Sequence, residues 1–263
     1  MVNISYIVIA LAFLGVSSRW NWWRKKIEGV SILMYHKIGV PPANSKLKKL
    51  WVSPKKFDAQ MEYLKKKGYE IITFKDIAEG TVKDGRKKVI ITFDDGYKNN
   101  YTEAFPILKK YGFRAVFYVV SGALGEKNLW HNPETEAPLE MMSADEIKEM
   151  AAAGMEIGGH TVSHKNLLCA EAAEAEREIF ENKEELEKLT GEKMLSFSYP
   201  YGGFNETVKE AVKKAGYLYA VIIKQGKNPF PFSDNFALKR LLVRGEEGLF
   251  DFYLNLSRGR GRF

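Results

Sequence analysis

Two adjacent carboxylates, Asp94 and Asp95, follow an apolar, β-branched run that begins at Val89. The run has the composition of a buried strand, and Gly96 marks the turn that ends it. Two carboxylates at the mouth of a buried strand repel each other and lose hydration, so they need a cationic partner. A bound metal ion is the simplest such partner. We therefore expect a metal site at this end of the strand.

A pair of histidines supplies matching ligands. His160 and His164 lie four residues apart, so one helical turn or a tight loop presents both to one ion. Two histidines with one carboxylate leave open positions, as catalytic zinc sites do, and the metal lowers the pKa of a bound water and polarises a carbonyl group. Successive strand residues point to opposite faces. We therefore expect one of Asp94 and Asp95 to bind the metal and the other to face the attacking water. Together the two motifs predict a metal-dependent hydrolase.

Strand-like and helix-like segments alternate after about residue 30. We expect strands at residues 31–35, 70–73, 88–93, 115–120, 155–158, 194–199, 219–223 and 238–243, and helices at 54–67, 100–111, 143–154, 170–189, 205–214 and 249–256. This alternation predicts a parallel sheet with helices outside, and about seven strand–helix units fit a closed or nearly closed (β/α) barrel. A doubly wound open sheet is the alternative, although no glycine-rich phosphate loop follows the first strand.

The residues that could do chemistry fall at or just after the carboxyl ends of these strands, which is the rim where barrel active sites assemble. They are His36, Asp94, Asp95, His160 and Tyr201. The long segment 121–142 has no expected secondary structure, and such segments are functional or disordered. Within or near it, Trp130 and Tyr97 are candidates for stacking on sugar rings, with core packing as the alternative reading.

Three segments resemble the motifs of the polysaccharide deacetylase family, carbohydrate esterase family four: residues 92–96, 160–164 and 198–202. The resemblance covers roughly residues 31–256, and the opening 33–38 is nearest to the branch that acts on poly-N-acetylglucosamine. It implies a distorted (β/α) barrel and a hydrolase that removes N- or O-acetyl groups from sugars.

The resemblance also implies roles for single residues. Asp94 is then the general base, and Asp95, His160 and His164 bind the divalent metal, with zinc expected first and cobalt or nickel as alternatives. Tyr201 lies where the family uses a backbone N–H, together with the metal, to hold the oxyanion.

Two departures from the family pattern concern the base and the acid. Ser198 stands where the third motif commonly has an arginine that orients the base, and Arg240 on the last expected strand is a candidate replacement. The family's general acid is usually a late histidine, but no histidine follows His164. His36 is our candidate for the acid or a substrate ligand, and His131 is a second candidate.

The amino-terminal residues 1–28 differ from the rest of the chain. Residues 4–16 are almost all apolar, and tryptophans with basic residues follow them. Even counted from residue 2 to residue 18, the run is shorter than the ~20 residues that cross a bilayer comfortably. We interpret it as an uncleaved membrane anchor, with a cleaved signal or a buried amphipathic element as alternatives.

We accordingly divide the chain into an anchor or signal-like segment (1–28), a catalytic domain (29–258) and a frayed tail (259–263). The protein is expected to be membrane-associated or exported to the cell envelope. The positive-inside rule would leave the domain on the cytoplasmic side, although a single short span is easily overridden.

Bulk properties fit one large domain with a short appendage, because the chain has 263 residues. The net charge of +7 is accompanied by no nucleic-acid motif, so we expect no nucleic-acid partner. The single cysteine, Cys169, cannot form an intramolecular disulfide.

The expected reaction is N-deacetylation of an N-acetylated glycan. The alternatives are deacylation of a membrane lipid-linked sugar and a non-catalytic glycan-binding relative. A glycosidase fits less well, because adjacent aspartates do not give a carboxyl separation of ~5–9 Å.

Overall fold

Seven parallel strands close into a barrel in the computed structural model, which describes residues 4–20 and 25–259. Their order is β1 (Ser31–Tyr35), β10 (Leu238–Leu242), β9 (Tyr219–Gln225), β8 (Ser196–Ser198), β7 (Glu156–Gly159), β6 (Val116–Val119) and β5 (Lys88–Phe93). Strand β5 pairs back with β1 in a register that places Ser31 opposite Val89. The short strand β4 (Glu70–Ile71) also pairs with β5. The expected (β/α) barrel is confirmed, and the open sheet is excluded by the β1–β5 pairing.

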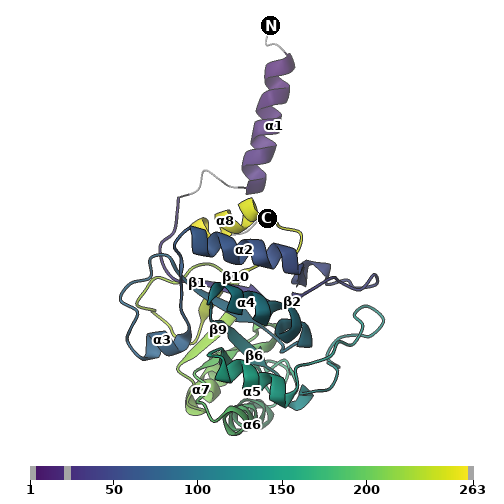
Figure 1. Cartoon of the computed structure of the whole chain (residues 1–263), viewed down its shortest axis with the longest axis vertical. Helices are drawn as coiled ribbons and strands as arrows, with labels where there is room; N and C mark the ends of the chain where they lie inside the picture. Colours follow the sequence, from purple (N-terminus) through teal and green to yellow (C-terminus); the bar gives the residue numbers. More distant parts are fainter. Residues whose placement is uncertain (1–3, 21–24, 260–263) are drawn as a thin grey trace.

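Helices surround the barrel (Figure 1). They are α2 (Pro54–Lys66), α3 (Phe74–Ala78), α4 (Phe105–Tyr111), α5 (Ala144–Ala152), α6 (Ala172–Thr190), α7 (Glu206–Lys214) and α8 (Leu249–Arg258). Helix α2 begins where the sequence predicts, because Ser53 Oγ accepts a hydrogen bond from the Lys56 amide. A capping box of Ser143 and Glu146 likewise opens α5.

The expected helix at 100–111 is divided into two parts. Residues Asn100–Ala104 form a π-helical turn, η2, and α4 follows with Pro106 in its first turn. Proline has no N–H to donate, so it is tolerated at the start of a helix and not in its interior. The remaining short elements are β2 (Lys37–Ile38), which pairs with β3 (Trp51–Val52), and the 3-10 turns η1 (Lys48–Leu50), η3 (Ser121–Ala123) and η4 (Pro200–Gly202).

The strand residues alternate between two hydrophobic clusters. In β5, Val89, Ile91 and Phe93 belong to the larger cluster, which also contains the buried residues of the surrounding helices. Ile90 belongs to the smaller cluster, whose members lie on the opposite face of the strands. Asp94 continues the face of Ile90, and Arg240 shares the corresponding face of β10 with Leu238. The alternation therefore turns both polar side chains toward the barrel interior.

Helix α1 (Ile4–Trp20) projects away from the barrel on the side where α2 and α8 lie (Figure 1). Its apolar side chains are exposed, for example Ile4 (77%) and Tyr6 (68%). Among the described residues, no helix combines the length and the apolar character needed to cross a membrane. Residues 21–24 of the stretch with tryptophans and basic residues, and residues 260–263 of the expected tail, lie outside the described residues.

Candidate active site

A buried ion pair joins the ends of β5 and β10. Arg240 donates two hydrogen bonds to Asp94, from Nη1 to Oδ1 at 2.6 Å and from Nη2 to Oδ2 at 2.7 Å. Burial alone would raise the pKa of Asp94, but the charge and hydrogen bonds of Arg240 hold that pKa below its ordinary value. Arg240 also donates to Ser198 Oγ at 3.2 Å. The guanidinium group thus lies beside Ser198 and fixes the orientation of an ionised Asp94.

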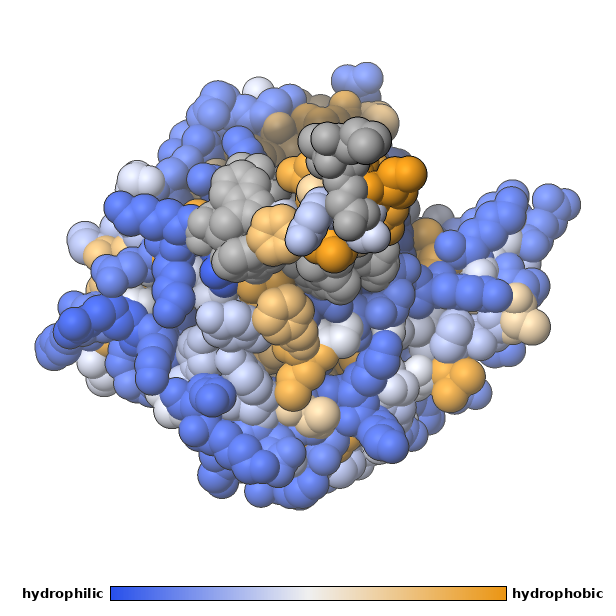
Figure 2. All heavy atoms as spheres, turned by 90° about the horizontal axis from the view of Figure 1, so that it is seen from above, coloured by the Kyte–Doolittle hydropathy of each residue, from blue (hydrophilic) through white to orange (hydrophobic). Residues whose placement is uncertain are grey.

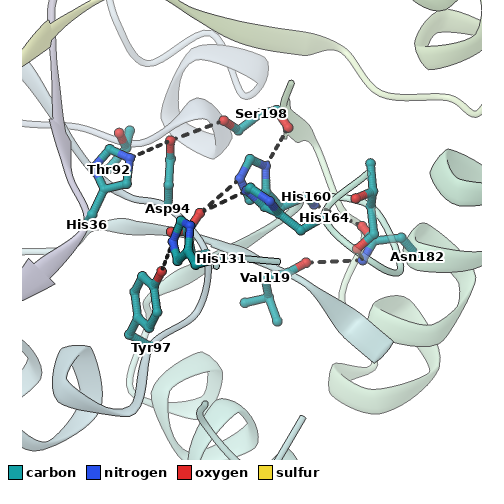
Figure 3. A network of polar contacts seen from close by, with 12 residues as sticks. His36, Thr92, Asp94, Tyr97, Val119, His131, His160, His164, Asn182 and Ser198 are labelled. Carbon is teal, nitrogen blue, oxygen red and sulfur yellow. Dashed lines mark hydrogen bonds and ion pairs between the residues drawn. The ribbon is translucent and has the colours of Figure 1, made fainter. Parts of the chain in front are cut away.

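Asp95, His160 and His164 converge on one another next to this pair. Figure 3 shows the two histidines close together near Asp94. Oδ1 of Asp95 lies 3.3 Å from Nε2 of each histidine, and all three side chains are buried. Burial raises the pKa of Asp95, whereas hydrogen bonds with the two histidines bring it well below its ordinary value. These residues offer three ligand atoms within 4.8 Å of one another.

The tautomer of His160 suits a metal ligand. Its Nδ1 lies 2.6 Å from the carbonyl oxygen of Ser198, which can only accept, so Nδ1 carries the proton. The lone pair of the neutral ring is then on Nε2, which faces Asp95. Two imidazoles and one carboxylate are a donor set that divalent zinc and its neighbours prefer, with positions left for water and substrate. The residues present therefore fit a catalytic metal ion.

Helix α6 holds the loop that carries the two histidines. Asn182 Oδ1 accepts a hydrogen bond from the His160 amide at 3.0 Å, and Nδ2 donates to the carbonyls of Thr161 and Val119 at 2.8 and 3.1 Å. One turn earlier, Glu178 accepts from the amide and hydroxyl of Ser163. The expected helix at 170–189 is therefore not simply a solvated outer helix, because the face that carries Glu178 and Asn182 is buried against the metal loop.

Close neighbours from α6 and from other parts of the chain explain the glycines before His160. A β-carbon at Gly159 would lie 2.1 Å from Tyr217 Oη and 2.7 Å from Asn182 Oδ1. A β-carbon at Gly158 would meet the Tyr118 ring at 2.7 Å. Any larger residue at either position would displace the start of the metal loop from these neighbours.

Four residues at the active-site rim of the barrel have positive φ angles. Asp95 has a φ of 77°, Thr161 67°, His164 59° and Tyr201 57°, values that residues with a side chain rarely adopt. The positive φ of Asp95 ends the regular strand geometry. The Asp94 side chain therefore contacts Arg240, whereas the Asp95 side chain faces the two histidines. Such strain is typical of functional sites and persists because surrounding contacts fix the chain.

His36 and Tyr201 complete the rim. His36 Nε2 lies 3.9 Å from Asp94 Oδ2, which is beyond hydrogen-bonding distance. Burial lowers the pKa of His36 below its ordinary value, although the nearby carboxylates oppose the change. The half-exposed ring of Tyr201 packs edge-on against His164 at 4.8 Å.

The segment 121–142, which we call the arm, is ordered against the metal ligands. The Trp130 ring stacks on His164 with 4.6 Å between ring centres. Tyr97 is completely buried next to the arm, and its Oη lies 3.3 Å from His131 Nε2. Core packing is thus the correct reading for Tyr97, which cannot stack on a sugar.

A second buried ion pair fastens the arm to the segment after β2. Glu136 accepts hydrogen bonds from the Ser45 hydroxyl and the Leu47 amide, and Lys37 Nζ lies 4.0 Å from its Oε2. Lys37 is itself buried and lies over the Tyr97 ring at 4.8 Å. These contacts join two segments that are about 90 residues apart in the chain.

Comparison with known proteins decides the family. The model of the family described as polysaccharide deacetylase matches residues 81–220, which are 140 of the 263 residues. The chain belongs to the polysaccharide deacetylase family. Members are hydrolases of carbon–nitrogen bonds other than peptide bonds, so this protein is an enzyme of that class.

Individual relatives agree with this assignment. YxkH of Bacillus subtilis (strain 168), named as a polysaccharide deacetylase, is 32% identical over 205 residues, 77% of this chain and 67% of that protein. The poly-beta-1,6-N-acetyl-D-glucosamine N-deacetylase of Staphylococcus aureus is 29% identical over 212 residues, 76% of this chain and 70% of the relative. The structure of Streptococcus pyogenes deacetylase PplD in complex with acetate superposes with a TM-score of 0.76 at 25% identity, covering 89% of this chain and all of that one.

The structure of this deacetylase brings every expected site residue to one rim: His36, Asp94, Asp95, His160, His164, Tyr201 and Arg240. Sequence reasoning missed the residues that position them, namely Glu178, Asn182 and the Glu136–Lys37 pair. One signal was present for Asn182, because asparagine is a poor helix former and stands in the middle of an otherwise helix-favouring segment.

Proposed function

We propose that this deacetylase removes N-acetyl groups from a polymer of N-acetylglucosamine. The observation that carries the proposal is the position of Asp94, oriented by Arg240, immediately beside the cluster of Asp95, His160 and His164. The Staphylococcus aureus relative is named for this reaction. The acetate bound to the Streptococcus pyogenes structure is the acid that deacetylation releases.

In the proposed mechanism Asp94 is the general base. It takes a proton from water as the water oxygen attacks the acetamide carbonyl, and Arg240 keeps the carboxylate ionised for that step. Asp95, His160 and His164 would hold a divalent metal, for which we propose zinc with cobalt or nickel as alternatives. When bound, this ion supplies Lewis-acid polarisation and lowers the pKa of water.

The charge that develops on the carbonyl oxygen needs a donor from the protein. We assign this role to the backbone N–H of Tyr201, which lies on the η4 turn beside His164. A donor fixed in advance stabilises an oxyanion without reorganisation during the reaction.

The leaving amine must gain a proton, and His36 is our candidate for this step. Its lowered pKa leaves the ring neutral at pH 7, so it can accept the proton that Asp94 has taken and pass it to the amine. His36 as a substrate ligand is the alternative role. His131 remains a second candidate for the acid, with its Nε2 beside Tyr97 Oη.

We also propose that residues 1–28 attach the enzyme to a membrane at the cell envelope. The apolar side chains of α1 are exposed, and Lys25 and Lys26 follow the helix. Figure 2, which looks onto the molecule from the α1 side, shows hydrophobic side chains near the centre of this face with hydrophilic ones around them. Deletion of residues 1–28 should move the enzyme from the membrane fraction to the soluble fraction, and unchanged fractionation would contradict this role.

Acetate release tests the proposed reaction. The full-length protein is treated with a chelator, supplied again with zinc, cobalt or nickel, and incubated with N-acetylglucosamine oligomers. We expect release that depends on the metal and is lost in Asp94→Asn but not in the exposed control Asp145→Asn. No release by metal-loaded protein from these oligomers would refute the proposed substrate.

A further inference from the structure

A cavity of about 370 Å³ lies between the segment after β2, the start of α2 and the segment after β10. Three lysines line it, Lys48, Lys49 and Lys56, together with one carboxylate, that of Glu246. The volume is within the range of small-molecule binding sites. None of the residues assigned to deacetylation lines this cavity, so the reaction described above leaves it without a role.

The lysines of the cavity are not neutralised by acidic side chains. Nζ of Lys56 donates to the carbonyl oxygen of Gly245 rather than to a carboxylate. Lys48 and Lys49 are exposed, and neither forms an ion pair with a described residue. The surrounding segment, residues 40–57, contains five lysines and no acidic residue. A hollow lined by one sign of charge attracts ions of the opposite sign, so the lining favours an anion.

Two further features of the lining favour an acceptor group. Helix α2 has 13 residues, and Ser53 at its N-cap lines the cavity, so the positive end of the helix dipole lies there. Trp51 also lines the cavity and is 8% exposed, and its indole N–H is buried with no hydrogen-bond partner among the described residues. An indole N–H can only donate. An acceptor bound against Trp51 would supply the missing partner.

The lining is fixed before any ligand binds. The Gly245 amide donates to the Lys49 carbonyl at 2.9 Å, and a β-carbon at Gly245 would lie 1.7 Å from the Trp51 carbonyl oxygen. On the other side of β3, the Gly39 amide donates to the Val52 carbonyl at 2.9 Å. Walls held in this way lose little conformational freedom on binding, which favours a built site over an accidental hollow.

The cavity lies at the same end of the barrel as the active site. Strand β3 pairs with β2, which begins directly after His36. Gly245 follows β10, whose Arg240 orients Asp94. A group held in the cavity would therefore lie at the end of the barrel from which the glycan approaches.

We propose that this cavity binds a phosphate ester. Lysine binds phosphate as a point charge, whereas a carboxylate is matched best by the fork of an arginine, and no arginine is among the described residues that line the cavity. A phosphate group offers several acceptor oxygens to three lysines, a helix N-terminus and an indole N–H. An uncharged sugar would leave the lysine charges unneutralised. The ester could belong to a soluble or glycan phosphate or to a lipid headgroup, which share this chemistry.

Calorimetric titration of the full-length protein tests the site, with glycerol phosphate and inorganic phosphate as probes. The variant Lys48→Gln with Lys49→Gln removes two exposed lysines of the lining. The control, Lys46→Gln with Lys55→Gln, removes two exposed lysines of the same segment that do not line the cavity. We expect the first variant to raise Kd about tenfold or more, the scale of one charge-assisted hydrogen bond, and the control to stay within about twofold.

Three results of these titrations would overturn the proposal. The first is the absence of measurable binding of either probe by the wild type at millimolar concentrations. The second is an equal loss of affinity in the cavity variant and in its control, which would indicate a diffuse effect of net charge. The third is equally tight binding of glucuronate, which carries a carboxylate in place of phosphate.

Vesicles identify the source of the phosphate. The wild type and both variants are sedimented with vesicles of phosphatidylcholine, with and without phosphatidylglycerol. A preference for phosphatidylglycerol that is lost only with Lys48 and Lys49 would assign the ester to a lipid headgroup. The same preference in all three proteins, with glycerol phosphate bound as expected, would assign it to a soluble or glycan phosphate.

The proposal does not depend on the proposed deacetylation. Acetate release from uncharged N-acetylglucosamine oligomers should remain within about twofold in the Lys48→Gln, Lys49→Gln variant, because neither lysine contacts the metal ligands or Asp94. Loss of acetate release together with phosphate binding would show that the variant disturbs the rim as a whole, and would overturn the assignment of a separate site.

Discussion

The Arg240 guanidinium meets the Asp94 carboxylate across the barrel interior, although β1 lies between their strands in the sheet. The pair spans 146 residues of sequence. The orientation of the proposed base thus depends on closure of the barrel, because β10 and β5 approach each other only when β1 pairs with both.

Arg240→Lys should reduce acetate release by about a hundredfold or more. Lysine keeps the charge but cannot make the two parallel hydrogen bonds that orient Asp94. Weaker pairing also raises the pKa of Asp94, so the acidic limb of the pH–rate profile should move to higher pH. The exposed Arg86→Lys is the control, and an unchanged profile in Arg240→Lys would argue against a role in orienting the base.

Metal binding should stabilise the fold through three residues. An ion at a thousand times its dissociation constant adds about 4 kcal/mol to the free energy of unfolding, which raises the melting temperature. His164→Ala should lose most of this increase. His131→Ala should keep it, because His131 is not among the three ligands. Equal loss in both variants, measured by thermal unfolding with and without zinc, would contradict the assigned ligand set.

Asn182→Ala should destabilise the protein by about 2–4 kcal/mol, because it removes the hydrogen bond to the buried His160 amide and one hydrogen bond to each of the buried carbonyls of Thr161 and Val119. It should also weaken metal binding, since Asn182 orients the loop of His160. The exposed Glu181→Ala on the same helix serves as control. Denaturant unfolding and zinc titration provide the two measurements, and unaltered zinc affinity would show that the loop keeps its shape without the Asn182 hydrogen bonds.

Glu156 begins β7, at the end of the barrel opposite the active site, and its titration should make the stability of the protein depend on pH. Burial raises its pKa to about 7, despite hydrogen bonds from the Lys75 amide and the Ser196 hydroxyl. The folded protein then holds a proton that the unfolded chain loses near pH 4.5. Stability should consequently fall as pH rises from about 4.5 to 7, by up to about 3 kcal/mol.

Glu156→Gln should remove this slope, because glutamine does not titrate. The control is Glu192→Gln, which changes an exposed carboxylate paired with Lys75. Unfolding free energies at pH 5, 6, 7 and 8 provide the measurement. A slope that persists in Glu156→Gln would assign the pH dependence to another group.

Local signals explain what the sequence revealed about the fold. The strand at 88–93 has the bounds expected from its apolar run, and α2 begins at the expected cap. The short helix α3 (Phe74–Ala78) was not expected, because five residues carry too little periodicity to be recognised. Elements with a clear local sequence signal were predictable, and elements that depend on tertiary contacts were not.

The same distinction applies to the site. The metal ligands could be predicted from residue type and spacing, because adjacent aspartates and closely spaced histidines at the ends of buried strands are typical of metal sites. Contacts such as Glu136 with Ser45 or Asn182 with Thr161 involve ordinary residue types at arbitrary separations. Their importance arises only from how the arm and α6 pack, which no local pattern encodes.

All four histidines of the chain lie at this one rim (Figure 3). Imidazole resonances in a histidine-selective nuclear magnetic resonance spectrum would therefore all originate from the active site, with no background from the rest of the molecule. Two of them should respond directly to a bound ion, and His36 and His131 should report on the proposed base and on the arm. The molecule thus carries its own set of spectroscopic reporters for metal, base and substrate.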